Sequence, residues 1–277
     1  MSDTLAPTPA PRTRGTGPGP RPPRGRRPAL GGAATMTGRA LRLSSRNVDA
    51  LITALVLPVL LMLVFVHLFG GAIDTGTRYV TYVVPGVLVL CAGYGSAATA
   101  VSVSTDMTGG IVDRFRSLDI GGTAVLTGHV MAGMARNLVS TVLVLAAAFL
   151  IGFRPEAGLA GHLAAAGVLL AFVLAFSWLA AAVGLLASSP EAASGFTFLV
   201  LFLPYPSSAF VPIDTMPSWL HGFAEHQPVT PVIEALRGLL LDQPVGSAPW
   251  TALAWCAGIT AVSVALAGAL FRRRTGG

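Results

Sequence analysis

The stretch LAGHLAAAGVLLAFVLAFSWLAAAVGLLA, residues 159–187, decides the fold, because it contains no Asp, Glu, Lys or Arg. The hydrocarbon core of a bilayer is about 30 Å thick, and about 20 helical residues cross it. The stretch is therefore predicted to be a membrane-spanning helix. The whole chain supports this interpretation, since 53% of its residues are apolar, 11% are charged, and its mean hydropathy is +0.70.

Uncharged runs of similar size recur along the chain and give six predicted spans. They are Ala50–Phe69, Tyr79–Val103, Asn137–Phe153, Leu159–Ala187, Gly195–Val211 and Ala248–Phe271. The third run is short unless its helix extends toward Ala124 while Arg136 reaches the membrane interface. The fifth contains Pro204 and Pro206, which are expected to break the helix and act as a hinge. We therefore expect an all-α polytopic membrane protein with six transmembrane helices, and Cys91 and Cys256 as buried thiols inside two of them.

Positive charge is concentrated at the N-terminus. Residues 1–49 hold nine Arg and two Asp (9 − 2 = +7), whereas the remainder holds nine Arg and ten acidic residues (9 − 10 = −1). Residues 1–33 are rich in Pro, Gly and Arg and are predicted to form a disordered tail. Residues 34–49 are expected to form an amphipathic helix at the membrane surface, or a simple positively charged anchor. The tail lacks a folded basic face, so nucleic acid is not an expected partner.

The distribution of arginine across the short loops predicts the orientation. With the N-terminus inside, Arg114, Arg116, Arg136 and the basic tail 272–277 lie in the cytoplasm together with the arginines of the N-terminal tail. We therefore expect a multi-pass plasma-membrane protein whose two termini are cytoplasmic. The membrane domain itself is predicted to cover residues 34–271.

The loop between the second and third predicted spans reads STDMTGGIVDRFRSLDI, residues 104–120, and is rich in charge. Its charged residues are Asp106, Asp113, Arg114, Arg116 and Asp119. Each of them costs about 2.5–3.5 kcal/mol at the centre of a spanning helix, so the loop stays outside the hydrocarbon. Ile111, Phe115 and Leu118 recur at i, i+4 and i+7, which is typical of one face of a helix. A short amphipathic helix in a cytoplasmic loop fits the groove of a partner, or packs against the ends of the spans.

The run D-x-x-x-G-I-V-D-R-F-R-S-L, residues 106–118, resembles the loop signature of the ABC type-2 transporter permeases, in particular the daunorubicin-resistance group. Two other stretches agree in order, namely YVVPG at residues 82–86 and MPSWLHGFAEHQPVTPVIEALRGLL at residues 216–240. The similarity covers residues 34–271. Two positions depart from the family pattern: Asp119 stands where proline is usual, and His129 stands where arginine is common.

The resemblance implies a permease that is not an enzyme by itself and that pairs with a second permease copy, as a homodimer or pseudo-dimer. Two separate ABC ATPase subunits would drive it, and ATP and magnesium would bind to them, so this chain would bind no cofactor. Residues 110–118 would be the coupling helix. Its contacts with the ATPase would be Ile111, Phe115 and Leu118, with Asp113, Arg114 and Arg116 fixing the register.

Residues 216–242 are too polar to span, and the resemblance implies a re-entrant or interfacial helical pair on the outer side. Trp219 is predicted to anchor at the interface. A second set of polar residues is expected to pair internally: Glu225, His226, Glu234 and Arg237. The resemblance also places the substrate path along the second and fifth spans. Candidate path residues are Tyr94, Phe196, Phe198, Phe202 and Tyr205, although aromatic residues in a span also face lipid or pack.

The source of energy can be addressed from residue types alone. Ion-coupled carriers use ionisable groups inside the membrane, and the six runs contain no Asp, Glu, Lys or Arg. The chain has no Lys, so it cannot contain a nucleotide-binding P-loop. Something outside the membrane must therefore supply the energy, and together with the resemblance this predicts an ATPase-driven exporter of an amphipathic antibiotic or lipid-like compound. The alternatives are an exporter of a lipid-linked glycan or cell-wall polymer, a polytopic membrane enzyme, and a non-transporting scaffold.

Overall fold

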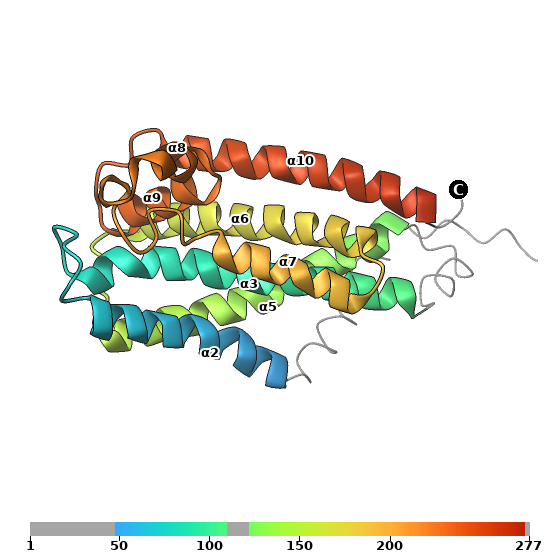
Figure 1. Ribbon diagram of the computed structural model, residues 1–277, viewed down its shortest axis with the longest axis horizontal. Coiled ribbons are helices and arrows are strands. Elements are labelled where there is room, and N and C mark those ends of the chain that lie inside the picture. Colours follow the sequence, from blue (N-terminus) through green and yellow to red (C-terminus); the bar gives the residue numbers. More distant parts are fainter. Residues whose placement is uncertain (1–47, 110–121, 275–277) are drawn as a thin grey trace, which may run out of the picture.

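The computed structural model describes residues 48–109 and 122–274, and helices are the only regular elements in those two ranges (Figure 1). The long elements are α2 (Val48–Val64), α3 (Tyr79–Thr108), α5 (Gly122–Ile151), α6 (Leu159–Leu186), α7 (Pro190–Phe202) and α10 (Ala248–Arg274). The short ones are the π-helix η1 (Phe65–Phe69), the 3-10 turn η2 (Ile213–Thr215), α8 (Ser218–His226) and α9 (Val229–Leu240). The predicted tail, surface helix and coupling helix lie outside the described residues, apart from Val48 and Asp49, which are the first residues of α2.

Four of the described helices, α3, α5, α6 and α10, are long and apolar enough to cross a membrane. Val56–Phe69 and α7 are apolar but shorter. A helix covers most of five of the six predicted runs, whereas α7 covers only the first part of the fifth run. The chain is a multi-pass membrane protein. The extension of the third helix is confirmed, since α5 begins at Gly122.

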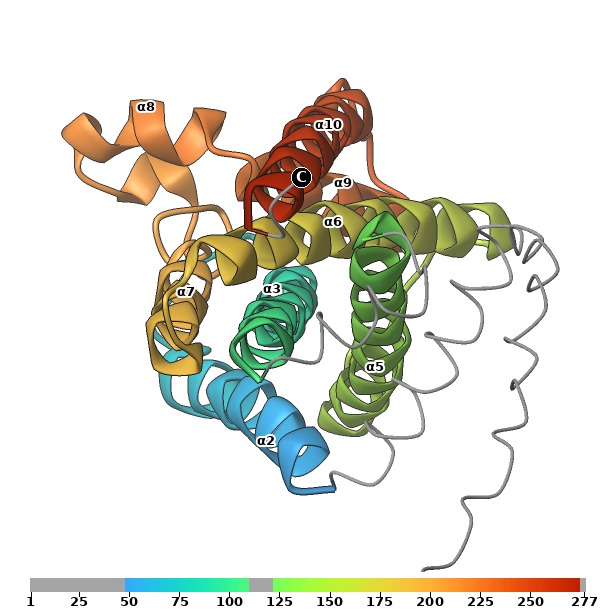
Figure 2. The ribbon, with the colours of Figure 1, turned by 90° about the vertical axis from the view of Figure 1, so that its right-hand side faces the viewer.

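The helices form a bundle around α3. In the end-on view α3 lies in the middle, with α2, α5, α6 and α7 around it, while α10 packs on the far side of α6 (Figure 2). Val83, Val84 and Val87 on α3 have no exposed surface, as expected for a helix that is surrounded on all sides. We call the end of the bundle that carries α8 and α9 the hairpin end. The opposite end, where α3 ends and α5 begins, is the loop end.

Close approach to α3 is made possible by glycine. A Cβ on Gly93 would lie 2.9 Å from the side chain of Val200 on α7, and one on Gly95 would lie 2.8 Å from Asn137 Oδ1 on α5. Glycine at these two positions therefore allows the neighbouring helices to pack closely against α3. Cys91 and Cys256 are also buried free thiols, as predicted.

The proline break in the fifth run is present. Ser189 caps the start of α7, where its hydroxyl accepts from Ala192 N at 3.2 Å. The helix ends at Phe202, because Pro204 and Pro206 have no N–H to continue the hydrogen-bond ladder. Residues 203–210 then form successive turns, which we call the broken segment.

Candidate functional site

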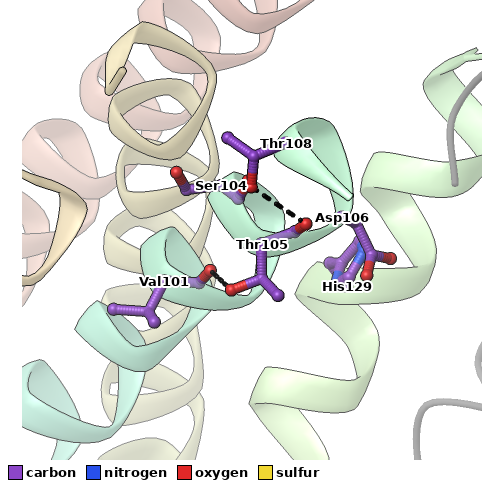
Figure 3. A network of polar contacts seen from close by, with 6 residues as sticks. All are labelled: Val101, Ser104, Thr105, Asp106, Thr108 and His129. Atoms are coloured by element: carbon purple, nitrogen blue, oxygen red, sulfur yellow. Dashed lines mark hydrogen bonds and ion pairs between the residues drawn. The ribbon is translucent and has the colours of Figure 1, made fainter. Parts of the chain in front are cut away.

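A polar contact joins α3 to α5 at the loop end (Figure 3). His129 Nε2 lies 3.0 Å from Asp106 Oδ2, and both side chains are largely buried. Two threonine side chains also hydrogen-bond to the backbone of α3 in its last turns: Thr108 Oγ1 donates to Ser104 O at 2.9 Å, and Thr105 Oγ1 donates to Val101 O at 2.8 Å. The contact therefore links the last turn of α3 to the second turn of α5.

The predicted coupling residues, 111, 113–116 and 118, lie outside the described residues, but the helices on both sides of them are described. The Asp106–His129 contact ties together the two helix ends between which that segment runs. The sequence drew attention to each residue separately, Asp106 in the loop signature and His129 as a departure from it. Their pairing was missed, because nothing in the spacing of residues 106 and 129 brings them together before the helices are packed.

The residues predicted for the substrate path fall into two groups. Phe198 and Phe202 project from α7 and are 64% and 62% exposed. Tyr94 and Phe196 are half-buried, and Phe196 packs against the core of the bundle. Tyr205, in the broken segment, has its ring 5.8 Å from that of Phe202.

Further aromatic rings continue from Tyr205 toward α2. The ring of Phe210 lies 5.1 Å from Tyr205 and 4.2 Å from Phe65, and Phe65 lies 5.5 Å from Phe69. We call the set Phe202, Tyr205, Phe210, Phe65 and Phe69 the aromatic run. Three of its members were missed from the sequence. The available signal was the i, i+4 spacing of Phe65 and Phe69 in the first span. These two residues begin and end the π-helix η1, and π-helical turns often occur at functional sites.

Polar side chains also join the helices inside the bundle. Asn137 Nδ2 on α5 donates to Ala92 O at 2.7 Å and to Ser96 Oγ at 3.0 Å, both on α3. Ser96 Oγ lies 3.5 Å from Val173 O on α6. Three helices are thus tied at one level, by an amide that has 1% of its surface exposed. Such a contact orients helices in lipid, where apolar burial gives no preference between partners.

The polar residues of the outer segment pair only in part as expected. Arg237 Nη2 donates to Ser208 O at 2.6 Å and to Tyr82 O at 3.3 Å, and its guanidinium carbon lies 3.8 Å from the centre of the Tyr82 ring. His226 contacts the carbonyl of Gly222 in its own helix. The expected pairing is thus present only in part: Arg237 interacts electrostatically with Glu234, but its hydrogen bonds go to backbone carbonyls of the broken segment and of α3.

A multi-pass helical bundle with a charged loop between two of its spans is the arrangement of a transporter permease. The chain belongs to the ABC-2 type transporter family, whose model matches residues 33–241. It is similar to the daunorubicin resistance ABC transporter permease protein DrrB1 of Streptomyces coeruleorubidus, with 34% identity over 222 residues, 78% of each chain. It is also similar to the probable doxorubicin resistance ABC transporter permease protein DrrC of Mycobacterium tuberculosis, with 28% identity over 228 residues, 82% of this chain and 83% of the relative.

Proposed function

We propose that the chain is the membrane subunit of an ATP-binding-cassette exporter that moves an amphipathic drug or lipid-like compound out of the cell. A separate ATPase would supply the energy, in two copies, to two copies of the permease. The observation that carries the proposal is the similarity to drug-resistance permeases over more than three quarters of the chain. The family model independently matches residues 33–241.

Coupling to the ATPase is assigned to residues 110–118, with Phe115, Ile111 and Leu118 seated in its groove. The Asp106–His129 contact supports this assignment, because it joins the helices on either side of that segment. A displacement of the segment would then move α3 and α5 together. Since α3 touches α2, α6 and α7 as well, movement at the loop end would reach most of the bundle.

The proposed topology has six crossings, with both termini in the cytoplasm. Besides the four long helices, α2 and η1 are continuous over residues 48–69. At 1.5 Å per residue they extend about 33 Å, which is enough to cross the hydrocarbon core. The remaining crossing would be α7 together with the broken segment, and it would place the hairpin end on the outer side.

The proposed substrate path runs along the aromatic run. Phe202 and Phe69 have exposed rings at its two ends, while Tyr205, Phe210 and Phe65 connect them. Neighbouring aromatic rings with one hydroxyl group offer a planar amphipathic compound both π-contacts and a hydrogen bond. Exposed rings on α7 are also available to a second permease copy, so that the path would lie between the two copies.

The test is the ATPase activity of the chain purified together with its ATPase in lipid nanodiscs. We expect stimulation by a planar aromatic drug such as daunorubicin and none by a polyprenyl-linked sugar. The variant Phe202→Ala should raise the half-stimulating drug concentration about tenfold, because an aromatic contact and its buried area contribute roughly 1–2 kcal/mol. Phe149→Ala is the control, since Phe149 is a partly exposed ring on α5 outside the aromatic run. Stimulation by the sugar alone would identify the glycan exporter instead.

A further inference from the structure

The broken segment, residues 203–210, has carbonyl groups that no helix satisfies. In a membrane, non-helical backbone must find hydrogen-bond donors within the protein, since lipid supplies none. Two of these carbonyls accept from one side chain: Gln227 Nε2 donates to Leu203 O at 3.3 Å and to Pro206 O at 3.1 Å. The hydroxyl of Ser207 donates to Pro204 O within the segment. The break is thus held by side chains, most of them from outside.

The remaining contacts anchor the C-terminal half of the segment to α3 and α9. Tyr79 Oη on α3 donates to Phe210 O at 2.8 Å. Arg237 Nη2 on α9 donates to Ser208 O at 2.6 Å, and the same guanidinium donates to Tyr82 O on α3. A Cβ on Gly86 would lie 2.8 Å from Ala209, so the backbone of the segment rests directly on α3. The YVVPG stretch of α3 therefore packs against the broken segment: Gly86 touches Ala209 directly, and Tyr82 is linked to Ser208 through Arg237.

Arg237 differs from the other donors in binding two elements at once. Its planar fork reaches carbonyls of the segment and of α3, while its face stacks on the Tyr82 ring 3.8 Å away. Burial lowers the pKa of this guanidinium, and Tyr82 and Glu234 oppose the shift. The group nevertheless stays cationic, because arginine is not deprotonated in proteins. Its hydrogen bonds are therefore charge-assisted and stronger than those of Tyr79 or Gln227.

We propose that Arg237 is the positioning residue of the broken segment: it fixes residues 203–210 against α3, and with them Tyr205 and Phe210 of the aromatic run. Displacing the segment from α3 requires Arg237 to release either Ser208 O or Tyr82 O. The positional claim stands on these contacts alone. Only its relevance to a drug path rests on the proposed function.

The test measures how often position 208 becomes accessible. Ser208 is 4% exposed, and Ser208→Cys changes one atom in a chain whose own Cys91 and Cys256 are replaced by alanine. The full chain in lipid nanodiscs is reacted with a water-soluble maleimide, which reaches both membrane faces, so the result does not depend on orientation. When opening is rapid, the labelling rate follows the population of the open segment.

Arg237→Met keeps the length of the side chain and removes its donors. We expect it to raise the labelling rate of the thiol introduced by Ser208→Cys about tenfold to a hundredfold, the range that corresponds to loss of a hydrogen bond from a charged group. Arg237→Lys should give an intermediate rate, because one ammonium group cannot reproduce the fork. Tyr79→Phe should give a smaller increase, since its hydrogen bond is neutral.

Asn137→Leu is the control for general loosening, because it removes the tie between α3 and α5 and leaves the broken segment untouched. It should lower the unfolding temperature without raising the labelling rate. An Arg237→Met chain that labels at the parental rate would overturn the proposal. So would an Asn137→Leu chain that labels as fast as Arg237→Met. Neither outcome would bear on whether the protein is an ATP-driven exporter.

Discussion

At the scale of single residues, the pair of His129 and Asp106 joins the two helices that flank the proposed coupling segment. The two side chains are 17% and 22% exposed, so their interaction is only partly screened by water, and we assign it about 1 kcal/mol. Its importance lies less in stability than in position. It keeps the helix that enters the segment beside the helix that leaves it.

Replacing either partner should weaken coupling while the chain remains folded. For His129→Ala or Asp106→Asn we expect a severalfold loss of drug-stimulated ATPase activity in the purified complex. His129→Arg should retain it, because a guanidinium keeps a positive charge beside Asp106 at every pH of the assay. His67→Ala serves as the control, since His67 is exposed and lies in η1, where its ring hydrogen-bonds to Leu63 O one turn earlier. If His129→Ala and the parent protein had equal drug-stimulated ATPase activity, the Asp106–His129 contact would have no role in coupling.

At the scale of elements, much of the architecture could be predicted from uncharged runs and prolines. The six runs, the helical extension toward residue 122 and the break after Phe202 all follow from local composition and from the missing N–H of Pro204 and Pro206. Contacts between helices could not be predicted in this way. Asn137 reaches Ser96, and Arg237 reaches Tyr82 and Ser208, only because distant segments pack side by side. A residue that hydrogen-bonds to a distant segment has no feature in its neighbouring sequence that identifies its partner.

The packing of α5 on α3 gives a prediction about glycine. In Gly95→Ala the new Cβ would lie 2.8 Å from Asn137 Oδ1 and 3.1 Å from its Nδ2, so Asn137 must move away from Ala92 O and Ser96. We expect the free energy of unfolding to fall by roughly 1–3 kcal/mol, seen as a lower unfolding temperature in detergent. Gly167→Ala on α6 is the matched control, because its Cβ would meet nothing within 4 Å. There the better helix propensity of alanine leaves stability unchanged or higher. A Gly95→Ala chain as stable as the parent would contradict this packing.

At the scale of the whole molecule, the chain is an apolar bundle with charge concentrated at its ends and in one loop. The charged segment 104–120 connects α3, the most enclosed helix, to α5. The uncharged runs exclude Arg136, and the extended third helix was expected to carry it with its side chain at the membrane interface. In the structure Arg136 lies within α5 and is half-buried. A Cβ added to Gly133 on α5 would lie 3.9 Å from Arg136 Nη2, 2.6 Å from Thr99 Oγ1 on α3 and 3.9 Å from Ser177 Oγ on α6. The guanidinium therefore lies near the face of α5 that packs against α3 and α6. Its neighbours there depend on the packing of the helices, which a hydropathy pattern does not predict.

The central claim is that an outside ATPase drives this bundle through residues 110–118. The most direct measurement is ATP-dependent uptake of daunorubicin into proteoliposomes that contain the chain and its ATPase with the nucleotide site facing outward. We expect uptake with the complete complex, and its loss in Phe115→Ala and Arg116→Glu although both variants still insert in the membrane. Uptake by the chain alone, or undiminished uptake by both variants, would contradict the account.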